Sequence, residues 1–188
     1  EYHSDDFSNM KFSKGEFNII LFDSSLHHFD RIDSFLKSCI APILNQNGIV
    51  VIFEYCGPNR LSWRKSQLNE SNKILLKLPP RFKTLIDGKS IKRKVYRPGL
   101  VRMMLVDPSE APDSENLVKS LNENFNVLEE KKLGWNITHL LLKWISHNFL
   151  KSDKETKKLL ELILDQEEAF VQTTQENDAI FGIYKMKM

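Results

Sequence analysis

The chain has few glycines and cysteines, and it lacks long apolar runs and a strong charge bias. Its 188 residues include 7 Gly and 2 Cys, and the formal net charge is +2. No glycine-rich loop of the nucleoside-triphosphate type appears, and the thiols lack the spacing of a zinc site. So small a charge favours neither nucleic acid nor a membrane surface as a partner. No apolar stretch approaches the ~20 residues of a membrane-spanning helix.

The overall composition is that of an ordinary globular protein. Hydrophobic residues make up 41% and charged residues 28% of the chain, and 188 residues suit one domain with its own core. Two thiols without a disulfide framework are typical of a reduced compartment. No signal peptide is recognisable, so we expect a cytoplasmic protein.

Two short apolar runs, each followed by a polar segment, organise the first part of the chain. Residues 18–22 precede the polar segment 23–29, and residues 48–53 precede the polar segment 54–60. Continuous runs of this kind are typical of strands buried on both faces. Apolar residues at helical spacing over 32–44 predict a helical crossover, and therefore parallel strands. Because ligands bind beyond the carboxyl ends of such strands, the polar segments mark the expected site.

The remainder alternates helical and strand patterns. We interpret residues 61–106 as an insertion that covers the strand ends, as a lid or an acceptor-recognition element; a solvated surface loop is the alternative. This stretch lacks aromatic residues interleaved for base stacking, which disfavours RNA binding. Further on, helices are predicted over 114–124, 137–149 and 153–173, and strands over 125–133 and 179–187.

Three sequence blocks resemble the class I S-adenosylmethionine-dependent methyltransferases. The blocks FNIILFDSSLHHF and LNQNGIVVIFEYCGPNR are similar to the family's fourth and fifth strands with the loops that follow them, and DPSEAPDSENL continues the resemblance. The resemblance implies an α/β fold, a Rossmann-like sheet closed by antiparallel strands, and S-adenosylmethionine as the cofactor. The family's glycine-rich first loop has no counterpart here. The chain thus resembles the C-terminal part of a methyltransferase with a helical insertion.

Under this interpretation the chain is one partial domain. Residues 1–60 form the strand–helix–strand core, residues 61–106 the insertion or lid, and residues 107–188 the helices and closing antiparallel strands. Activity is then expected to require the missing N-terminal half.

The resemblance implies cofactor contacts at two places. Asp6 and Phe7 match an acidic and apolar pair that contacts the adenine ring, and a solvated tail is the alternative. Asp23 and Ser24 end the first strand at the level of the cofactor's methionine portion. A carboxylate there would accept a hydrogen bond from the α-ammonium group, or would only cap a loop.

Two adjacent histidines are the candidates for proton removal. Methyl transfer to a hydroxyl acceptor requires a base, and an imidazole titrates near neutral pH. Because neighbouring residues that leave a strand point in opposite directions, one of His27 and His28 is expected to face the pocket, with a slight preference for His28. A structural histidine is the alternative. Glu54 is expected to contact the acceptor or orient a histidine, or alternatively to pair with Arg60 or another base of the insertion.

Tyr55 and Arg60 complete the expected site as substrate-binding residues, with Tyr55 as a wall of the pocket. No residues with metal-ligand spacing are recognised, so no metal is expected. The sequence therefore predicts methyl transfer from S-adenosylmethionine to a small-molecule acceptor. The alternative is a non-catalytic, truncated methyltransferase-like domain that forms a homodimer through an open sheet edge.

Overall fold

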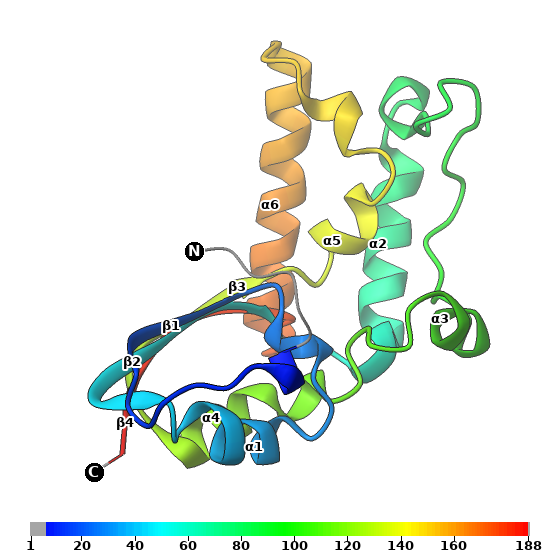
Figure 1. Ribbon diagram of the computed structural model, residues 1–188. Helices are drawn as coiled ribbons and strands as arrows, with labels where there is room; N and C mark the ends of the chain where they lie inside the picture. The colour runs from blue at the N-terminus through cyan, green and yellow to red at the C-terminus, as the bar shows by residue number, and fades with distance from the viewer. Residues whose placement is uncertain (1–6, 188) are drawn as a thin grey trace.

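Four strands form one mixed sheet in the computed structural model, which describes residues 7–187 (Figure 1). The strand order is β1-β2-β4-β3; β1 and β2 are parallel, and β4 is antiparallel to both β2 and β3. The expected α/β fold with closing antiparallel strands is confirmed. The strands are β1 (Phe17–Asp23), β2 (Leu44–Tyr55), β3 (Phe125–Gly134) and β4 (Ala179–Met186).

Six α-helices and several short helical turns connect and extend the sheet in the described part of the chain. The helices are α1 (Ile32–Phe35), α2 (Lys65–Lys77), α3 (Leu100–Val106), α4 (Leu117–Asn124), α5 (Thr138–Leu142) and α6 (Lys154–Thr174). A π-helical turn, Leu36–Ile40, prolongs α1, and a 3-10 turn named η2, Leu26–His28, follows β1. No helix among the described residues is long and apolar enough to cross a membrane.

The observed helices differ from the prediction at α5 and at α3. The helix expected over 137–149 ends at Leu142, because the Lys92 ammonium group donates to the carbonyls of Leu140, Leu141 and Lys143 at 2.9, 2.9 and 2.8 Å. These contacts satisfy carbonyl groups that a continued helix would use. Helix α3 was not predicted, since every position from 100 to 106 is apolar or basic and no polar face marks a helical period.

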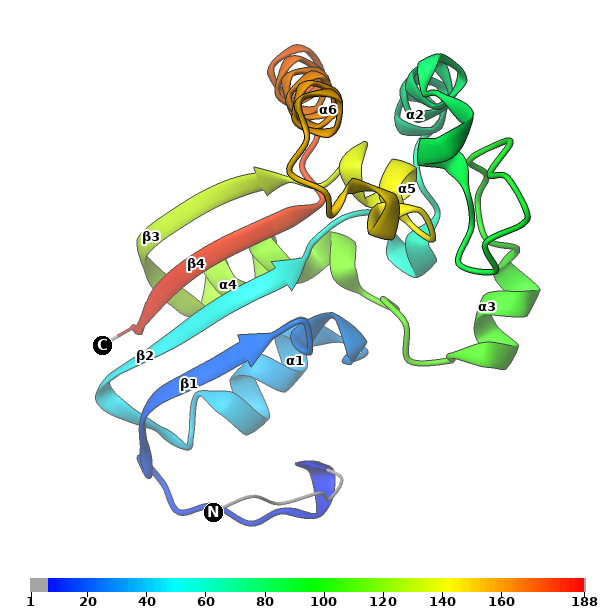
Figure 2. The same ribbon diagram turned by 90° about the horizontal axis from the view of Figure 1, so that it is seen from above.

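The buried side chains form two separate cores. In the sheet region, α1 and α4 cover one face of the sheet (Figures 1 and 2). In the helical region, α2, α5 and α6 pack together beyond the strand ends. Fully buried members of the sheet core include Leu26, Ile32, Val50, Ile52 and Tyr184, and those of the helical core include Leu75, Ala111, Leu141 and Ile163.

The second face of the sheet is bare among the described residues. Ile19 is 61% exposed, Leu21 64% and Phe53 39%, because α1 and α4 lie on the same side. The prediction that both first strands are buried on both faces is therefore wrong for this chain. Leu164 of α6, in the helical region, is also exposed at 59%.

The insertion lies where the parallel strands end. In Figure 2 the arrowheads of β1 and β2 point toward the region of α2, α3 and α5. Helix α2 buries Ile74 and Leu75 in the helical core, and Trp63 before it is also buried. The segment from Trp63 to Leu78 is thus part of the packed structure rather than a solvated loop.

Candidate functional site

Glu54, the penultimate residue of β2, is a buried carboxylate with four donors. Its Oε1 accepts from the backbone N–H groups of Ser25 and Leu26, both at 2.7 Å. Its Oε2 accepts from the backbone N–H of His27 at 3.4 Å and lies 2.7 Å from His27 Nδ1. The parallel pairing of β1 with β2 places the Glu54 carboxylate beneath η2. An ionised carboxylate only accepts hydrogen bonds, so Nδ1 bears the ring proton and the neutral ring has its lone pair on Nε2.

The two histidine rings lie side by side rather than on opposite sides of the chain. Their centroids are 4.3 Å apart with the planes tilted by 35°. The expectation of opposite directions is wrong because η2 is a 3-10 turn, in which successive side chains do not alternate as in a strand. The side chain of His27 is buried, whereas His28 is half-buried and its Nδ1 lies 3.2 Å from both the Oγ and the carbonyl O of Ser109.

Three side chains at this place have the composition of a metal-ligand set. Ligand atoms of His27, His28 and Glu110 all lie within 4.8 Å of one another, and His27 Nε2 is 3.9 Å from Glu110 Oε1. The Glu54 carboxylate contacts Nδ1 of His27, whereas Nε2 is the ring nitrogen near Glu110. In metal sites, a carboxylate on the second ring nitrogen orients a metal-bound histidine in the same way. These residues could hold one divalent ion, a possibility that residue spacing along the sequence does not reveal.

Arg60 fixes the segment that contains Glu110. Its guanidinium donates to the carbonyls of Pro108 and Glu110, and its backbone N–H donates to the carbonyl of Ala111 at 2.7 Å. The expected alternative of an ion pair between Glu54 and Arg60 is therefore wrong. Arg60 instead positions the Ser109–Glu110 segment against the histidines.

Tyr55 lies next to His27 with its hydroxyl group already bonded. The ring centroids of Tyr55 and His27 are 6.1 Å apart, and the Tyr55 hydroxyl donates to the carbonyl of Pro58 at 3.0 Å. Burial, the main cause, raises the pKa of Tyr55 well above its usual range. The ring is a wall beside the histidine and is not a second base.

The expected cofactor residues lie at the end of β1 and before it. Asp23 and Ser24 are exposed, and Asp23 has no cationic partner among the described residues. Phe7 packs among aromatic rings, 5.5 Å from Phe35 and 6.3 Å from Phe29 by ring centroids. Asp6 lies outside the described residues.

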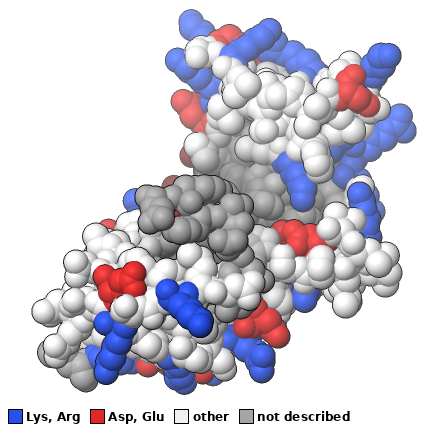
Figure 3. All heavy atoms as spheres, viewed as in Figure 1, with Lys and Arg blue, Asp and Glu red and all other residues white. Residues whose placement is uncertain are grey.

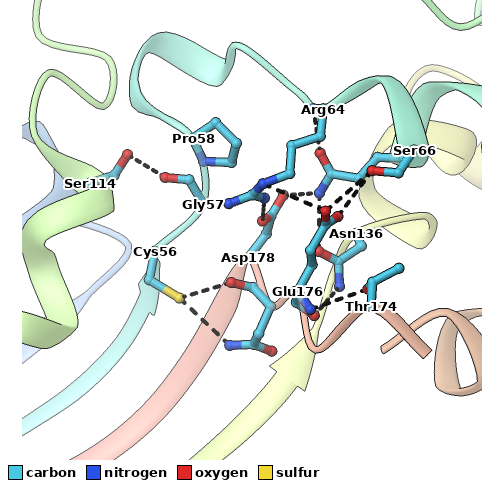
Figure 4. A network of polar contacts seen from close by, with 12 residues as sticks. Cys56, Gly57, Pro58, Arg64, Ser66, Ser114, Asn136, Thr174, Glu176 and Asp178 are labelled. Atoms are coloured by element: carbon cyan, nitrogen blue, oxygen red, sulfur yellow. Dashed lines mark hydrogen bonds and ion pairs between the residues drawn. The ribbon is translucent and has the colours of Figure 1, made fainter. Parts of the chain in front are cut away.

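A second polar network, not found from the sequence, joins the sheet to the helical region (Figure 4). Asp178, just before β4, is 1% exposed; its carboxylate accepts from Arg64 at 3.1 Å and from Gln67 at 2.6 Å. Gln67 also donates to Asn136 at 3.0 Å. Burial raises the pKa of Asp178 to about 6 despite these donors. The four residues come from three separate parts of the sequence and share no motif, so only the fold reveals the network.

Comparison with known proteins finds similar structures but no similar families. Neither a family model nor a curated protein matches the chain. A candidate methyltransferase from Bacillus halodurans is 16% identical with a TM-score of 0.43, over 100% of this chain and 78% of the other. The geranyl diphosphate C-methyltransferase of Streptomyces coelicolor, crystallised with S-adenosylhomocysteine, is 10% identical with a TM-score of 0.43, over 96% and 49%.

The [4+2]-cyclase SpnF is also similar, at 11% identity and a TM-score of 0.43, over 97% of this chain and 54% of that one. The chain thus spans about half the length of the geranyl diphosphate enzyme and of the cyclase.

Proposed function

We propose that this chain belongs to an enzyme that transfers a methyl group from S-adenosylmethionine to a small-molecule acceptor. The observation that supports this most directly is the 2.7 Å contact between His27 Nδ1 and the buried Glu54 carboxylate. It lies beyond the carboxyl ends of two adjacent parallel strands, where ligands bind in such sheets. The sequence blocks that resemble methyltransferases include both residues.

The protein's part in the reaction is to position and deprotonate the acceptor. When bound, the cofactor supplies an electrophilic methyl group on a sulfonium. The lone pair of His27 Nε2 takes the proton of an acceptor hydroxyl as its oxygen bonds to the methyl carbon, and Glu54 stabilises the resulting imidazolium. With the cofactor bound, the bond between its sulfur and the methyl carbon would break and leave the bonding electron pair on sulfur. This assignment favours His27 over His28, which with Ser109 would form the polar wall beside the acceptor.

The residues around β1 suit the cofactor. The exposed Asp23 carboxylate is open to an ammonium group, and the ring of Phe7 offers an apolar surface for a flat base. We therefore assign Asp23 and Ser24 to the amino-acid portion and Phe7, with Asp6, to the adenine. The glycine-rich loop of the family is not among these residues, and we propose that full activity requires a segment that supplies it.

Calorimetric titration with S-adenosylhomocysteine tests the cofactor assignment. Micromolar binding would support the assignment if Asp23→Asn weakens that binding roughly tenfold. Asp30→Asn, which changes another exposed carboxylate, is the control. If the chain binds the ligand and Asp23→Asn leaves the affinity unchanged, the assignment of Asp23 is overturned. No binding at millimolar ligand would mean that activity requires a longer chain.

Replacement of the histidines in a cofactor-binding form of the protein tests the base. His27→Ala is expected to lower kcat by roughly 10²–10⁴-fold, and His28→Ala by less. Glu54→Gln is a second test, because an amide that donates to Nδ1 would move the ring proton to Nε2 and remove the base. Equal activity of Glu54→Gln and the parent protein would contradict the role assigned to His27. Loss of activity on chelation, restored by a divalent ion, would assign the histidines to a metal instead.

Self-association is the second candidate function, supported by the bare sheet face. Ile19 and Leu21 lie exposed on β1, at the edge of the sheet. Proteins normally cover an edge strand of this kind. Light scattering is expected to show a dimer that Leu21→Lys dissociates, with Leu150→Lys, an exposed leucine outside the sheet, as the control. A strict monomer would exclude this alternative.

A further inference from the structure

A cavity of about 560 Å³ lies between the insertion after β2 and the segment around α5. Its volume is within the range of about 300–1,000 Å³ that holds small organic ligands. Much of its wall is apolar and is made by residues such as Trp63, Leu85, Val95, Met103 and Leu140. The cavity is therefore suited to the apolar body of a small molecule.

The polar part of the wall has one sign of charge. Five basic residues line the cavity and no acidic one does: Lys92, Arg93, Lys94, Arg102 and Lys143. Within the part of the chain that the structure describes, none of the five has a carboxylate within 4.0 Å, whereas Arg81 nearby has both Asp153 and Glu155. Figure 3 shows that Lys and Arg lie over much of the helical region in the upper half of the view. Unlike Lys92, whose ammonium group is bonded to three carbonyls, the other four are available to a ligand.

Two titratable groups near the cavity have lowered pKa values, mainly because of burial and to a lesser extent because of neighbouring positive charges. Burial, and then the charge of Lys143, lowers the pKa of Lys92 to about 8. Burial and the charges of Lys143 and Lys92 lower the pKa of His139 to about 4. An anion in the cavity would reduce this repulsion between like charges.

Aromatic rings and a donor add to the wall. The Lys143 ammonium lies 5.8 Å from the ring centroid of Trp63 and 5.9 Å from that of Trp144. The indole N–H of Trp63 is buried and has no acceptor among the described residues.

The cavity is connected to the histidine pair by one short segment. Helix α3 contributes Arg102, Met103 and Val106 to the wall and is followed directly by Asp107. Two residues later, Ser109 contacts His28. The cavity wall and the candidate catalytic site are therefore neighbours along the chain, with residues 102–106 in the wall and residues 109–110 at the histidines.

We propose that this cavity binds an amphipathic anion, a molecule with an apolar body and a carboxylate or phosphate group. The apolar wall would take the body, and Arg93, Lys94, Arg102 and Lys143 the anion. Resting on the proposed function, we further infer that this anion is the class of molecule that accepts the methyl group.

Binding of three matched probes, octanoate, octyl phosphate and octanol, tests the proposal in the absence of cofactor. The indole fluorescence of Trp63 and Trp144 in the wall reports binding. Octanoate or octyl phosphate is expected to bind roughly tenfold or more tightly than octanol, and the preference should fall with added salt. The anion that binds more tightly shows whether the site prefers a carboxylate or a phosphate group. Equal binding of all three probes, or binding of none, would overturn the proposal.

Charge-removing variants locate the site. Arg102→Gln combined with Lys143→Gln is expected to weaken anion binding roughly tenfold and leave octanol binding unchanged. The control pair, Lys131→Gln with Lys158→Gln, removes two exposed charges elsewhere and should change neither. Unchanged anion binding in the first pair would overturn the proposal. Anion binding by a protein that binds no S-adenosylhomocysteine would sustain the cavity proposal independently of the methyl-transfer function.

Discussion

Glu54 and Glu167 are buried carboxylates in different regions of the molecule, and each accepts four hydrogen bonds, two on each oxygen. Glu54 accepts from η2 and from the His27 ring. Glu167 of α6 accepts from the backbone of residues 136–138 at the start of α5 and from the Asn136 side chain. Both therefore satisfy backbone donors at the start of a helical turn. The difference is the fourth partner, a titratable imidazole in the sheet region and an amide in the helical region.

This difference separates a structural role from a chemical one. A buried glutamate that binds backbone N–H groups orders a loop wherever it occurs, so burial of Glu54 alone says nothing about catalysis. An imidazole held by that same carboxylate has a fixed tautomer and a free lone pair. The candidate catalytic residues therefore lie in the sheet region. Glu167 in the helical region is a matched control for the effect of a buried glutamate on the stability of a loop.

The largest expected effect is the loss of either carboxylate. Glu54→Leu and Glu167→Leu should each lower the free energy of unfolding by roughly 3–5 kcal/mol, because several buried donors lose their acceptor. Urea denaturation measures both. If Glu54→Leu cost less than 1 kcal/mol while Glu167→Leu cost several, the two glutamates would not share a structural role.

A pH-dependent effect is expected at Asp178, which joins the two regions. The pKa of this carboxyl group is raised to about 6 in the folded protein from an ordinary value of about 3.9. Its contribution to stability is therefore fully present below pH ~4 and is lost as the pH rises through ~6. The free energy of unfolding of the parent protein, relative to Asp178→Asn, should fall by roughly 2–3 kcal/mol between those limits.

Denaturation of both proteins at a series of pH values checks this expectation. Asp165→Asn, on the exposed face of α6, serves as the control and should show no such trend. A difference between the parent protein and Asp178→Asn that stays constant with pH would mean that the pKa of the carboxyl group is not perturbed by folding. A difference that instead increases with pH would mean that the ion pair with Arg64 outweighs the effect of burial.

The smallest expected effect is at Leu164 of α6, which follows the buried Ile163 in the sequence. Ile163 is fully buried in the helical core, and Leu164 is 59% exposed. Ile163→Ala should lower the free energy of unfolding by about 2–4 kcal/mol, and Leu164→Ala by less than about 0.5 kcal/mol. Thermal or urea unfolding separates the two. A large cost at Leu164 would indicate that another surface covers this side of the helical region in solution.

Much of the secondary structure was predictable because it depends on local patterns. Residues 18–22 and 48–53 are continuous apolar runs, and they form the adjacent parallel strands β1 and β2. Helix α6 and strand β4 also appear where periodicity predicts them. Helix α5 is shorter than predicted because the ammonium group that ends it belongs to Lys92, far away in sequence. The local sequence pattern of one chain does not predict such a contact.

The candidate site was predictable in its place and only partly in its geometry. The order of strands and polar segments by itself determined that His27, His28 and Glu54 would lie near one another, since parallel strands end at the same edge. Only the tertiary structure decided that Glu54 bonds to His27, that Arg60 fixes the segment containing Glu110, and that five basic residues line one largely apolar cavity. Local patterns specify which elements form, whereas the pairing of side chains from distant elements depends on how those elements pack.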